Sequence, residues 1–271
     1  MSETEPAADQ VTDRQRQILQ LVSLNGFATI EALARHFDVS TQTIRRDIIR
    51  LDELQLLQRF HGGAGLREAA GTADPAGEAE TVRLGYVQKQ QIAADAKMRI
   101  ASAAAALIGD GASLFLDVGT TVEAAARALR DRQGLRIFTC SMRTAMLLAE
   151  HNGNEVFVTG GLVRGADGSL VGEATLEAIA RFRPDYALLG FSGIDNDGAI
   201  MDFDLQKVAA KQAMLAAARQ SFMLGDATKF DRSSLVRVTP LERLSGLVTD
   251  QTPPVWLEEK LGRTGVRLVV G

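Results

Sequence analysis

The pattern of apolar and polar positions predicts three short helices at the start of the chain. The first is expected to begin at Thr12 or Asp13 and to end at Asn25-Gly26, and the second to run from Ile30 to Phe37. Ser40 is expected to cap the third, because its hydroxyl can accept a hydrogen bond from the first turn. The apolar positions that repeat with helical spacing are Ile18, Leu19, Leu21, Val22, Ile30, Leu33, Ala34, Phe37, Ile44, Ile48 and Leu51. The short connection between the second and third helices is typical of a helix-turn-helix.

The third predicted helix carries side chains suited to DNA recognition. Gln and Arg can pair with adenine and guanine edges through two hydrogen bonds, and Arg and Thr also reach phosphates. After this helix, residues 56–60 predict a strand and residues 61–64 a turn, so a β wing is expected. The predicted DNA contacts from the helix and the wing are Ser40, Thr41, Gln42, Thr43, Arg45, Arg46, Arg50, Arg59, His61 and Gly62. The alternative is an ordinary three-helix bundle with a charged outer face.

The second half of the pattern alternates short apolar runs with helical segments. Strands are predicted at 113–118, 135–139, 155–159, 186–191, 221–224, 246–249 and 266–270. Helices are predicted at 88–107, 121–130, 142–150, 174–181, 205–219 and 255–261. This alternation predicts an α/β domain with a mainly parallel sheet covered on both faces. Ligands of such sheets bind beyond the carboxyl ends of the strands.

Composition divides the chain between these two patterns. Residues 68–82 are rich in Ala, Gly and Glu and contain few large apolar side chains, which is typical of a linker. We therefore expect a disordered tail at residues 1–10, a DNA-binding domain at 11–67, the linker, and a second domain at 83–271.

Charge is distributed unevenly along the chain. Between residues 11 and 67, eight Arg face six acidic residues, a net charge of +2, which leaves −6 for the remainder of a chain whose net charge is −4. A basic segment joined to an acidic one fits a DNA-binding module fused to another domain. Because the positive excess is small, the pattern favours a homodimer or homotetramer that presents several DNA-binding modules.

Other features restrict the class of protein. Cys140 is the single cysteine, which suits a reducing compartment, and residues 1–10 are polar and acidic, unlike a signal peptide. The longest apolar stretch, residues 100–108, is too short to cross a bilayer, so a cytoplasmic protein without a membrane partner is expected. The sequence contains no cluster of Cys and His with metal-ligand spacing, no Walker loop and no full dinucleotide fingerprint, so we expect no metal and no cofactor.

Small and hydroxylic residues recur where the predicted strands end. Gly119 lets backbone approach a ligand, and the helix start that follows it attracts an anion, so a phosphate is the expected guest. Lys229 could supply the positive charge. The predicted ligand contacts at these strand ends are Asp117, Gly119, Thr120, Thr121, Thr139, Ser141, Gly160, Gly161, Gly190, Ser192, Gly193, Asp226 and Lys229. The alternative for any single loop is that its glycine only makes a tight turn.

Together these motifs resemble the DeoR family of transcriptional regulators. The first domain is similar to a DeoR-type winged helix-turn-helix, and the second to that family's sugar-phosphate sensor domain, whose fold is similar to ribose-5-phosphate isomerase. The resemblance rests on residues 39–47 and 59–64, on Lys89 with Ile92-Ala93, and on residues 117–121, 160–161, 190–195 and 226–230. It adds Lys89 to the predicted ligand contacts. Cys140 stands where the family commonly has Asn.

The resemblance implies a DNA-binding repressor of a carbohydrate or glycerol regulon, which a phosphorylated small molecule releases from operator DNA. Residues 172–204 are most similar to family members that control glycerol-3-phosphate metabolism, so glycerol-3-phosphate is the inducer we expect first, with pentose or hexose phosphates as alternatives. A phosphosugar isomerase with Asp117 or Asp226 as base and Lys229 as electrophile is the enzymatic alternative. A DNA-binding architectural protein without a ligand is the third. The fused DNA-binding module argues against an enzyme, so no catalytic residue is predicted.

Overall fold

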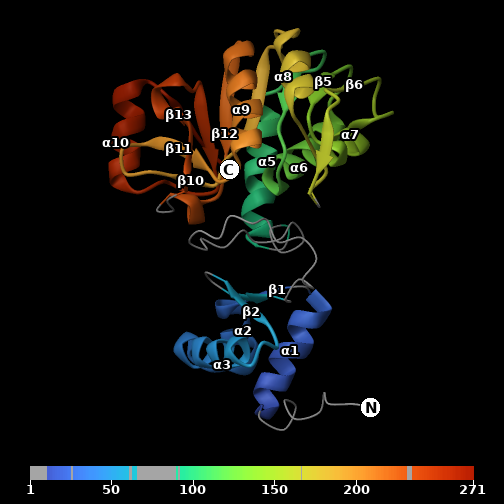
Figure 1. Ribbon diagram of the computed structural model, residues 1–271. Helices are drawn as coiled ribbons and strands as arrows, with labels where there is room; N and C mark the ends of the chain where they lie inside the picture. Colours follow the sequence, from blue (N-terminus) through green and yellow to red (C-terminus); the bar gives the residue numbers. More distant parts are fainter. Residues whose placement is uncertain are drawn as a thin grey trace. The chain divides into compact units, whose positions relative to one another are not determined.

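The protein folds into two compact units, which we describe separately in a computed structural model (Figure 1). The description covers residues 11–25, 27–60, 63–65, 90, 92–165, 167–230 and 234–271. We call residues 1–92 the head and residues 93–271 the body. The predicted tail at 1–10 and the predicted linker at 68–82 lie outside the described residues.

The head contains the three predicted helices and a small antiparallel sheet. Its elements are α1 (Asp13–Asn25), β1 (Phe27–Thr29), α2 (Ile30–Phe37), α3 (Thr41–Glu53), β2 (Gln58–Phe60) and β3 (Gly63–Gly65). The strand order is β1-β3-β2, so β2 and β3 form the predicted wing hairpin. Strand β1 is not predicted by the pattern, because three residues are too few for an alternation to be recognised. The predicted strand at 56–60 begins only at Gln58.

The core of the head confirms the apolar faces assigned to the helices. Ile18, Ile44 and Leu51 are completely buried, and Ile30 and Leu33 pack with them. Ser40 caps α3 as predicted, since its Oγ accepts a hydrogen bond from the Thr43 N–H at 3.2 Å. One side of α3 is therefore fixed in the core, while its polar residues other than Asp47 lie outside it.

Asp47 is a buried acidic residue on the inner side of α3. Its carboxylate accepts hydrogen bonds from Arg14 Nε at 2.6 Å and from Gln15 Nε2 at 3.0 Å, both on α1. A buried carboxylate needs such partners, because an unpaired charge is costly away from water. These contacts fix α3 against α1 and thereby set the orientation of its outer face.

The body is built on a seven-stranded parallel sheet with the order β15-β14-β12-β9-β4-β5-β6. The strands are β4 (Ser113–Leu116), β5 (Arg136–Thr139), β6 (Glu155–Val158), β9 (Tyr186–Gly190), β12 (Gln220–Leu224), β14 (Gly246–Thr249) and β15 (Arg267–Val270). Each predicted strand is confirmed to within two residues at either end. Two smaller sheets pair β7 (Leu162–Arg164) with β8 (Ser169–Val171), and join β10 (Gly193–Ile194), β11 (Ala199–Asp202) and β13 (Val236–Pro240).

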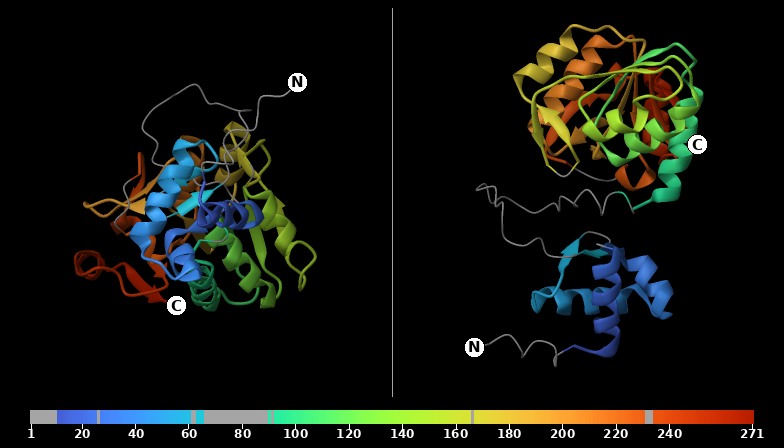
Figure 2. Two further views of the ribbon diagram at one scale, coloured as in Figure 1. Left: turned by 90° about the horizontal axis from the view of Figure 1, so that it is seen from below. Right: turned by 90° about the vertical axis from the view of Figure 1, so that its right-hand side faces the viewer.

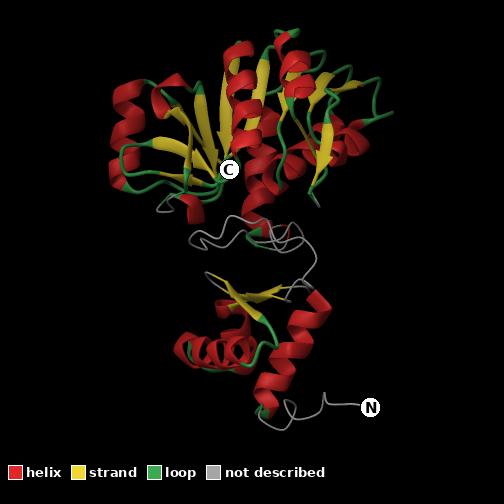
Figure 3. Cartoon of the chain, viewed as in Figure 1, coloured by secondary structure: helices red, strands yellow, loops and turns green. Residues whose placement is uncertain are grey.

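Helices cover both faces of the large sheet (Figure 3). The helices are α5 (Ala94–Ala106), α6 (Thr120–Ala128), α7 (Met142–Leu148), α8 (Glu173–Ala180), α9 (Leu205–Ala217) and α10 (Val255–Thr264), with short 3-10 turns η2 (Leu129–Asp131), η3 (Ala227–Lys229) and η4 (Leu241–Arg243). On one face, Leu114 and Leu116 pack with α5 and α6, and on the other Phe115 packs in the core that includes residues of α8, α9 and α10. This three-layer arrangement confirms the predicted fold class.

Two predicted features of the body differ from the structure. The helix predicted at 88–107 is not continuous: Gln90 is helical, but α5 begins at Ala94, because Ala93 adopts a left-handed conformation (φ 53°) that an α-helix cannot continue through, and residues 88, 89 and 91 lie outside the described residues. The small strands β7, β8, β10, β11 and β13 are not predicted, since each is short and pairs outside the main sheet. Among the described residues, no helix has the length and apolar character needed to span a membrane.

Candidate functional site

The outer face of α3 presents the residues predicted to contact DNA. Thr41, Gln42, Arg45, Arg46 and Arg50 are all exposed, whereas Ile44 and Ile48 on the same helix are buried. The hydroxyls of Ser40 and Thr43 lie 2.9 Å apart and serve the helix cap. Arg59 is exposed on β2 of the wing, and its N–H donates to Asp52 Oδ1 at 3.2 Å. His61 and Gly62 lie outside the described residues. The face has the donors that base edges and phosphates require.

In the body, the predicted ligand residues that the structure describes lie at the carboxyl ends of the strands of the large sheet. They follow β12, β9, β4, β5 and β6, which are neighbours in the sheet. The chain winds from β4 towards β6 in one direction and from β9 towards β15 in the other, so the order reverses between β4 and β9. Such a reversal opens a crevice beyond the carboxyl ends of the two strands. Asp117 follows β4 and Gly190 ends β9, which places both at this point.

A buried ion cluster occupies the reversal point. Asp117 Oδ2 accepts a hydrogen bond from the Gly190 N–H at 3.1 Å and forms an ion pair with Lys211 on α9. Lys211 Nζ also lies 3.5 Å from Asp202 Oδ2, and Ser192 Oγ donates to Asp202 Oδ1 at 2.9 Å. Asp117 and Lys211 are only 1% and 2% exposed, so the cluster is almost completely desolvated.

The cluster holds Lys211 in its charged form. Burial alone disfavours the ammonium, but the negative charges of Asp117 and Asp202 and the Asp117 hydrogen bond outweigh that effect and raise the pKa of Lys211 above its usual value. The sequence analysis did not select Lys211. A signal was present, because Lys211 follows Val208 and precedes Met214 at three-residue spacing, on the buried face of a helix rich in Ala.

The loop after β4 leaves its backbone open. Gly119 has φ 138°, a conformation that favours glycine, and a Cβ at this position would meet no atom within 4 Å. Gly119 precedes the first turn of α6 as its N-cap and makes no side-chain cap, so the first N–H groups of that turn, which have no intrahelical acceptor, receive no cap from this residue. Thr120 is half-buried at the helix start, and Thr121 is buried. Buried Glu123 lies in the same turn and adds an acidic group close to the loop.

Other predicted ligand residues have defined structural partners. Thr139 Oγ1 donates to the Leu116 carbonyl at 2.7 Å, and Ser141 Oγ accepts from the Thr144 N–H at 3.1 Å as the cap of α7. A Cβ on Gly161 would lie 2.3 Å from Thr175 Oγ1, so close packing explains this glycine. The Gly160 carbonyl accepts from Thr175 Oγ1 at 2.7 Å. Gly193 begins β10, and Lys89 lies outside the described residues.

The loop after β12 carries the predicted cation. Lys229 Nζ donates to the Phe191 carbonyl at 2.7 Å and lies 5.2 Å from the centre of the Phe191 ring. Asp226 caps η3 by accepting from the Thr228 N–H at 3.1 Å. Although burial acts in the opposite direction, the charge of Lys229 and the Thr228 hydrogen bonds lower the pKa of Asp226. Phe191 follows β9, so Lys229 is anchored beside the same strand end as Gly190.

Comparison with known proteins decides the family. A model of the DeoR C-terminal sensor domain matches residues 92–251, more than half of the chain, and a model of the DeoR-like helix-turn-helix domain matches residues 14–70. The chain belongs to the DeoR family. It is 39% identical over 240 residues to the glycerol-3-phosphate regulon repressor of Haemophilus influenzae, covering 89% of each chain. It is 37% identical to the protein of the same name from Escherichia coli, covering 90% of this chain and 92% of that one.

These DeoR family relatives confirm the predicted function of a DNA-binding transcriptional repressor. Their names describe regulators and not enzymes. Among solved structures, ribose 5-phosphate isomerase A from Methanocaldococcus jannaschii is 17% identical, with a TM-score of 0.38 over 51% of this chain and 55% of that one. Among the residues that the structure describes, no group of three or more His, Cys, Asp and Glu side chains could hold a metal ion.

Cys140 is predicted to be unreactive. Burial and, to a smaller extent, the nearby charge of Asp117 raise the pKa of its thiol to about 12. Because the thiolate is the reactive form, iodoacetamide should not label the native protein at pH 8 and should label it fully in urea. Intact-mass measurement checks this directly, since the chain has one cysteine. Rapid labelling of the native protein would contradict the buried position.

Proposed function

We propose that this DeoR family protein binds operator DNA through α3 and is released when glycerol-3-phosphate binds at the β4–β9 reversal point of the body. The observation that carries the ligand site is the open backbone of Gly119 at the start of α6, directly after the buried ion pair of Asp117 with Lys211. An open helix N-terminus attracts a phosphate, because its N–H groups have no intrahelical acceptor.

The phosphate is proposed to bind the Gly119-Thr120 backbone and the Thr120 hydroxyl. Lys229 is proposed to add the countercharge, since the flexible end of its side chain can exchange the Phe191 carbonyl for a phosphate oxygen. Glu123 in the same turn of α6 opposes an anion, and Lys211 is already paired with Asp117 and Asp202, so the positive charge of Lys229 is needed to make the site favourable.

The uncharged part of the ligand is proposed to face Ser192 and Asp202. The Ser192 hydroxyl donates to Asp202, and both side chains are partly exposed, so either can contact a ligand hydroxyl group. Tyr186 begins β9, at the opposite end of the strand from Gly190, and packs beside Phe222. It therefore offers no platform for a sugar ring at the carboxyl ends of the strands. A small phosphorylated triol fits these groups, and the names of the two relatives given above support the same ligand.

We infer that the body binds its ligand without turnover. Asp117 is committed to Gly190 and Lys211, and Asp226 caps η3, so neither carboxylate is placed as a general base in this structure. Regulation then requires that the ligand bind more tightly to the arrangement of the protein that does not hold DNA. A homodimer or homotetramer is proposed as the DNA-binding form, because one head carries a net charge of only +2 between residues 11 and 67.

The inducer assignment predicts a specific order of responses. Glycerol-3-phosphate should release the full-length protein from an operator selected from random duplex DNA, whereas free glycerol should not, because only the phosphate reaches the start of α6. Fluorescence anisotropy of labelled operator measures the release. Release by a fructose phosphate without a response to glycerol-3-phosphate would contradict the proposed ligand, and turnover of any phosphosugar would contradict a pure sensor.

Two substitutions test the site itself. Thr120→Ala and Lys229→Ala should retain operator binding but require at least roughly tenfold more inducer, the equivalent of one lost charge-assisted hydrogen bond. Thr252→Ala and Lys260→Ala are controls of the same chemistry, because Thr252 is exposed and Lys260 lies on α10 beside Glu242, and these variants should respond like the wild type. An unchanged dose response in both test variants would remove these residues from the site.

A further inference from the structure

Strand β6 forms an open, apolar edge of the large sheet. It is the last strand in the sheet order, and among the described residues its only sheet neighbour is β5. Phe157 and Val158 are each 44% exposed, and Leu162 and Val163 on the following strand β7 are 68% and 56% exposed. Figure 2 (right) views the body from this side, where β6 and α7 face the reader. Exposed apolar residues gathered along an unpaired strand mark a surface that associates with another protein.

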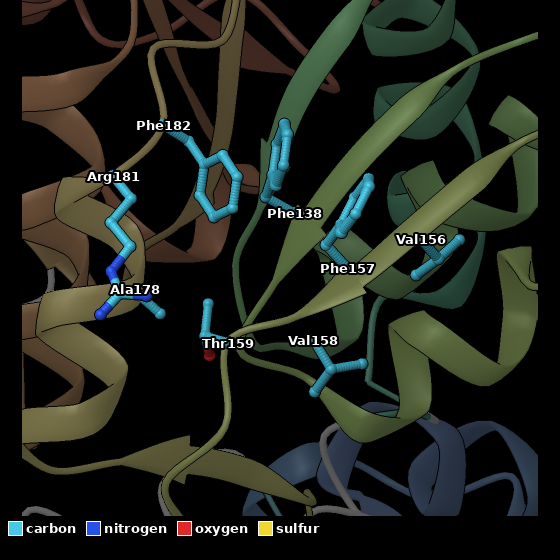
Figure 4. Close-up of a pocket in the computed structure, with 8 residues that line it drawn as sticks. All are labelled: Phe138, Val156, Phe157, Val158, Thr159, Ala178, Arg181 and Phe182. Atoms are coloured by element: carbon cyan, nitrogen blue, oxygen red, sulfur yellow. The ribbon is translucent and has the colours of Figure 1, made fainter.

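The two faces of β6 differ in what they present. Phe157 stacks on Phe138 with ring centres 5.1 Å apart, and Phe138 stacks on Phe182 at 4.0 Å, so three aromatic rings follow one face of the edge (Figure 4). A groove of about 320 Å³ lies along these rings and includes Arg181. Val156 packs on the opposite face, in the core that contains α5 and α6. Phe157 and Val156 therefore point to opposite sides of the sheet.

Glu155 is the single charged residue in β6 that could protect this edge. Proteins usually block an exposed edge with Lys, Pro or a bulge, and β6 consists of Glu155 followed by three apolar residues. The opposite edge strand, β15, also has one charged residue, Arg267, followed by three apolar ones. The two edges differ in exposure, because Phe157 and Val158 are both exposed on β6, whereas Val270 is the one exposed apolar residue of β15, and this difference points to β6 as the edge that is covered in the working protein.

The hydrogen bonds to β5 fix which groups remain for a partner. The Glu155 N–H donates to the Leu135 carbonyl at 2.8 Å, and the Thr159 N–H donates to the Thr139 carbonyl at 3.1 Å. Residues 155, 157 and 159 therefore direct their backbone groups towards β5. Because these directions alternate along a strand, the N–H and C=O groups of Val156 and Val158 point outward.

We propose that β6 pairs antiparallel with β6 of a second copy of this chain, about a two-fold axis at Phe157. In this register Val156 of one copy faces Val158 of the other, so every outward backbone group finds an acceptor or donor in the partner. The two Phe157 rings meet as a pair without hydrogen bonds between their backbones, which is the closer type of cross-strand pair. This inference names the surface for the oligomer assumed under the proposed function and rests on it.

Charge complementarity supports a second copy of the chain as the partner. Antiparallel pairing at Phe157 places Glu155 opposite the partner subunit's Thr159, on the face of the sheet where Arg181 lines the groove beside Thr159. Glu155 would then lie close to the partner subunit's Arg181, and the two-fold axis repeats this pair. Both side chains are exposed, and within the described part of the chain neither makes an intramolecular ion pair.

The first experiment measures the mass of the full-length protein by light scattering over a range of concentrations. Wild type is expected to be a dimer or a multiple of one, and Phe157→Glu should dissociate at this surface because it brings two carboxylates together at the axis. Val270→Glu is the matched control, since Val270 is 48% exposed on the opposite edge strand, and its mass should remain that of the wild type. A monomeric wild type, or a Phe157→Glu protein with unchanged mass, would overturn the proposal.

Charge reversal tests the register independently of the apolar contacts. Glu155→Arg and Arg181→Glu should each weaken association by roughly tenfold, because two symmetric pairs become repulsive in each variant. The double variant should recover wild-type association, which a merely local effect of either substitution would not produce. Failure of that recovery would overturn the register.

A separate readout distinguishes this inference from the proposed function. Protection of the body against heat by glycerol-3-phosphate should be retained in Phe157→Glu, because the strand ends of β4 and β9 are not part of the interface. If Phe157→Glu keeps this protection but does not dissociate, only the proposed interface is contradicted. If Phe157→Glu dissociates but glycerol-3-phosphate protects neither the variant nor the wild type, only the proposed ligand is contradicted.

Discussion

Replacement of Lys211 by Met is expected to destabilise the body by about 3–5 kcal/mol, the cost of removing one partner from a buried ion pair. Lys211 is 2% exposed and is paired with Asp117, which is 1% exposed, so its loss leaves a carboxylate without a countercharge and away from water. Met has a similar length and removes the charge without opening a large cavity. Urea unfolding followed by circular dichroism measures the change in the free energy of unfolding.

Lys207→Met is the matched control for this prediction. Lys207 lies one helical turn before Lys211 and pairs with Asp167, but the two side chains are 23% and 20% exposed, so water can solvate the remaining carboxylate. A loss of roughly 1 kcal/mol or less is expected there. Equal losses of stability in the two variants would contradict the prediction that the buried Asp117–Lys211 pair costs more to break than the partly exposed Asp167–Lys207 pair.

The double variant Arg45→Ala with Arg46→Ala should lose most of its affinity for operator DNA. Each arginine that contacts a guanine edge is worth roughly 1–3 kcal/mol, so two contacts amount to a loss of about 10²-fold or more in affinity. Both side chains lie on the exposed face of α3, opposite the buried Ile44 and Ile48, so the head should remain folded. Anisotropy with the selected operator measures affinity, and circular dichroism verifies the fold.

Salt dependence separates base contacts from phosphate contacts in the same variants. Loss of a phosphate contact should weaken binding to all DNA sequences and reduce the slope of log affinity against log salt, whereas loss of a base contact should reduce discrimination between sequences. Arg130→Ala, an exposed arginine of the body, is the control and should leave operator affinity unchanged. Wild-type operator binding by the double variant would show that α3 is not the recognition helix.

The helix caps and strand ends of this protein follow from local sequence. Ser40 caps α3 because its hydroxyl meets an N–H three residues later, and the apolar runs that became β4, β5 and β9 are recognisable because each is a continuous buried segment. The same locality places Gly119 at a strand end and before a helix, which is why an anion site could be predicted there. The candidate ligand residues were found at strand ends for this reason.

Pairs that are distant in sequence were decided only by the tertiary structure. Asp117 and Lys211 are 94 residues apart, and although helical spacing places Lys211 on the buried face of α9, nothing local indicates that this face meets the end of β4. Asp47 reads as one more polar residue of α3 until α1 supplies Arg14 and Gln15. A buried charge is stable only beside its partner, so its presence becomes interpretable once the partner is known.

The sequence by itself therefore determined the two domain types, the exposed face of α3 and the glycine and hydroxyl groups at the strand ends, because these depend on residues within one or two turns of each other. Only the tertiary structure decided that the strand order reverses between β4 and β9, that Lys211 neutralises Asp117 there, and that β6 is left as an open edge. Strand order is set by how helices pack across the whole sheet, and periodicity along the chain carries no record of which strands become neighbours.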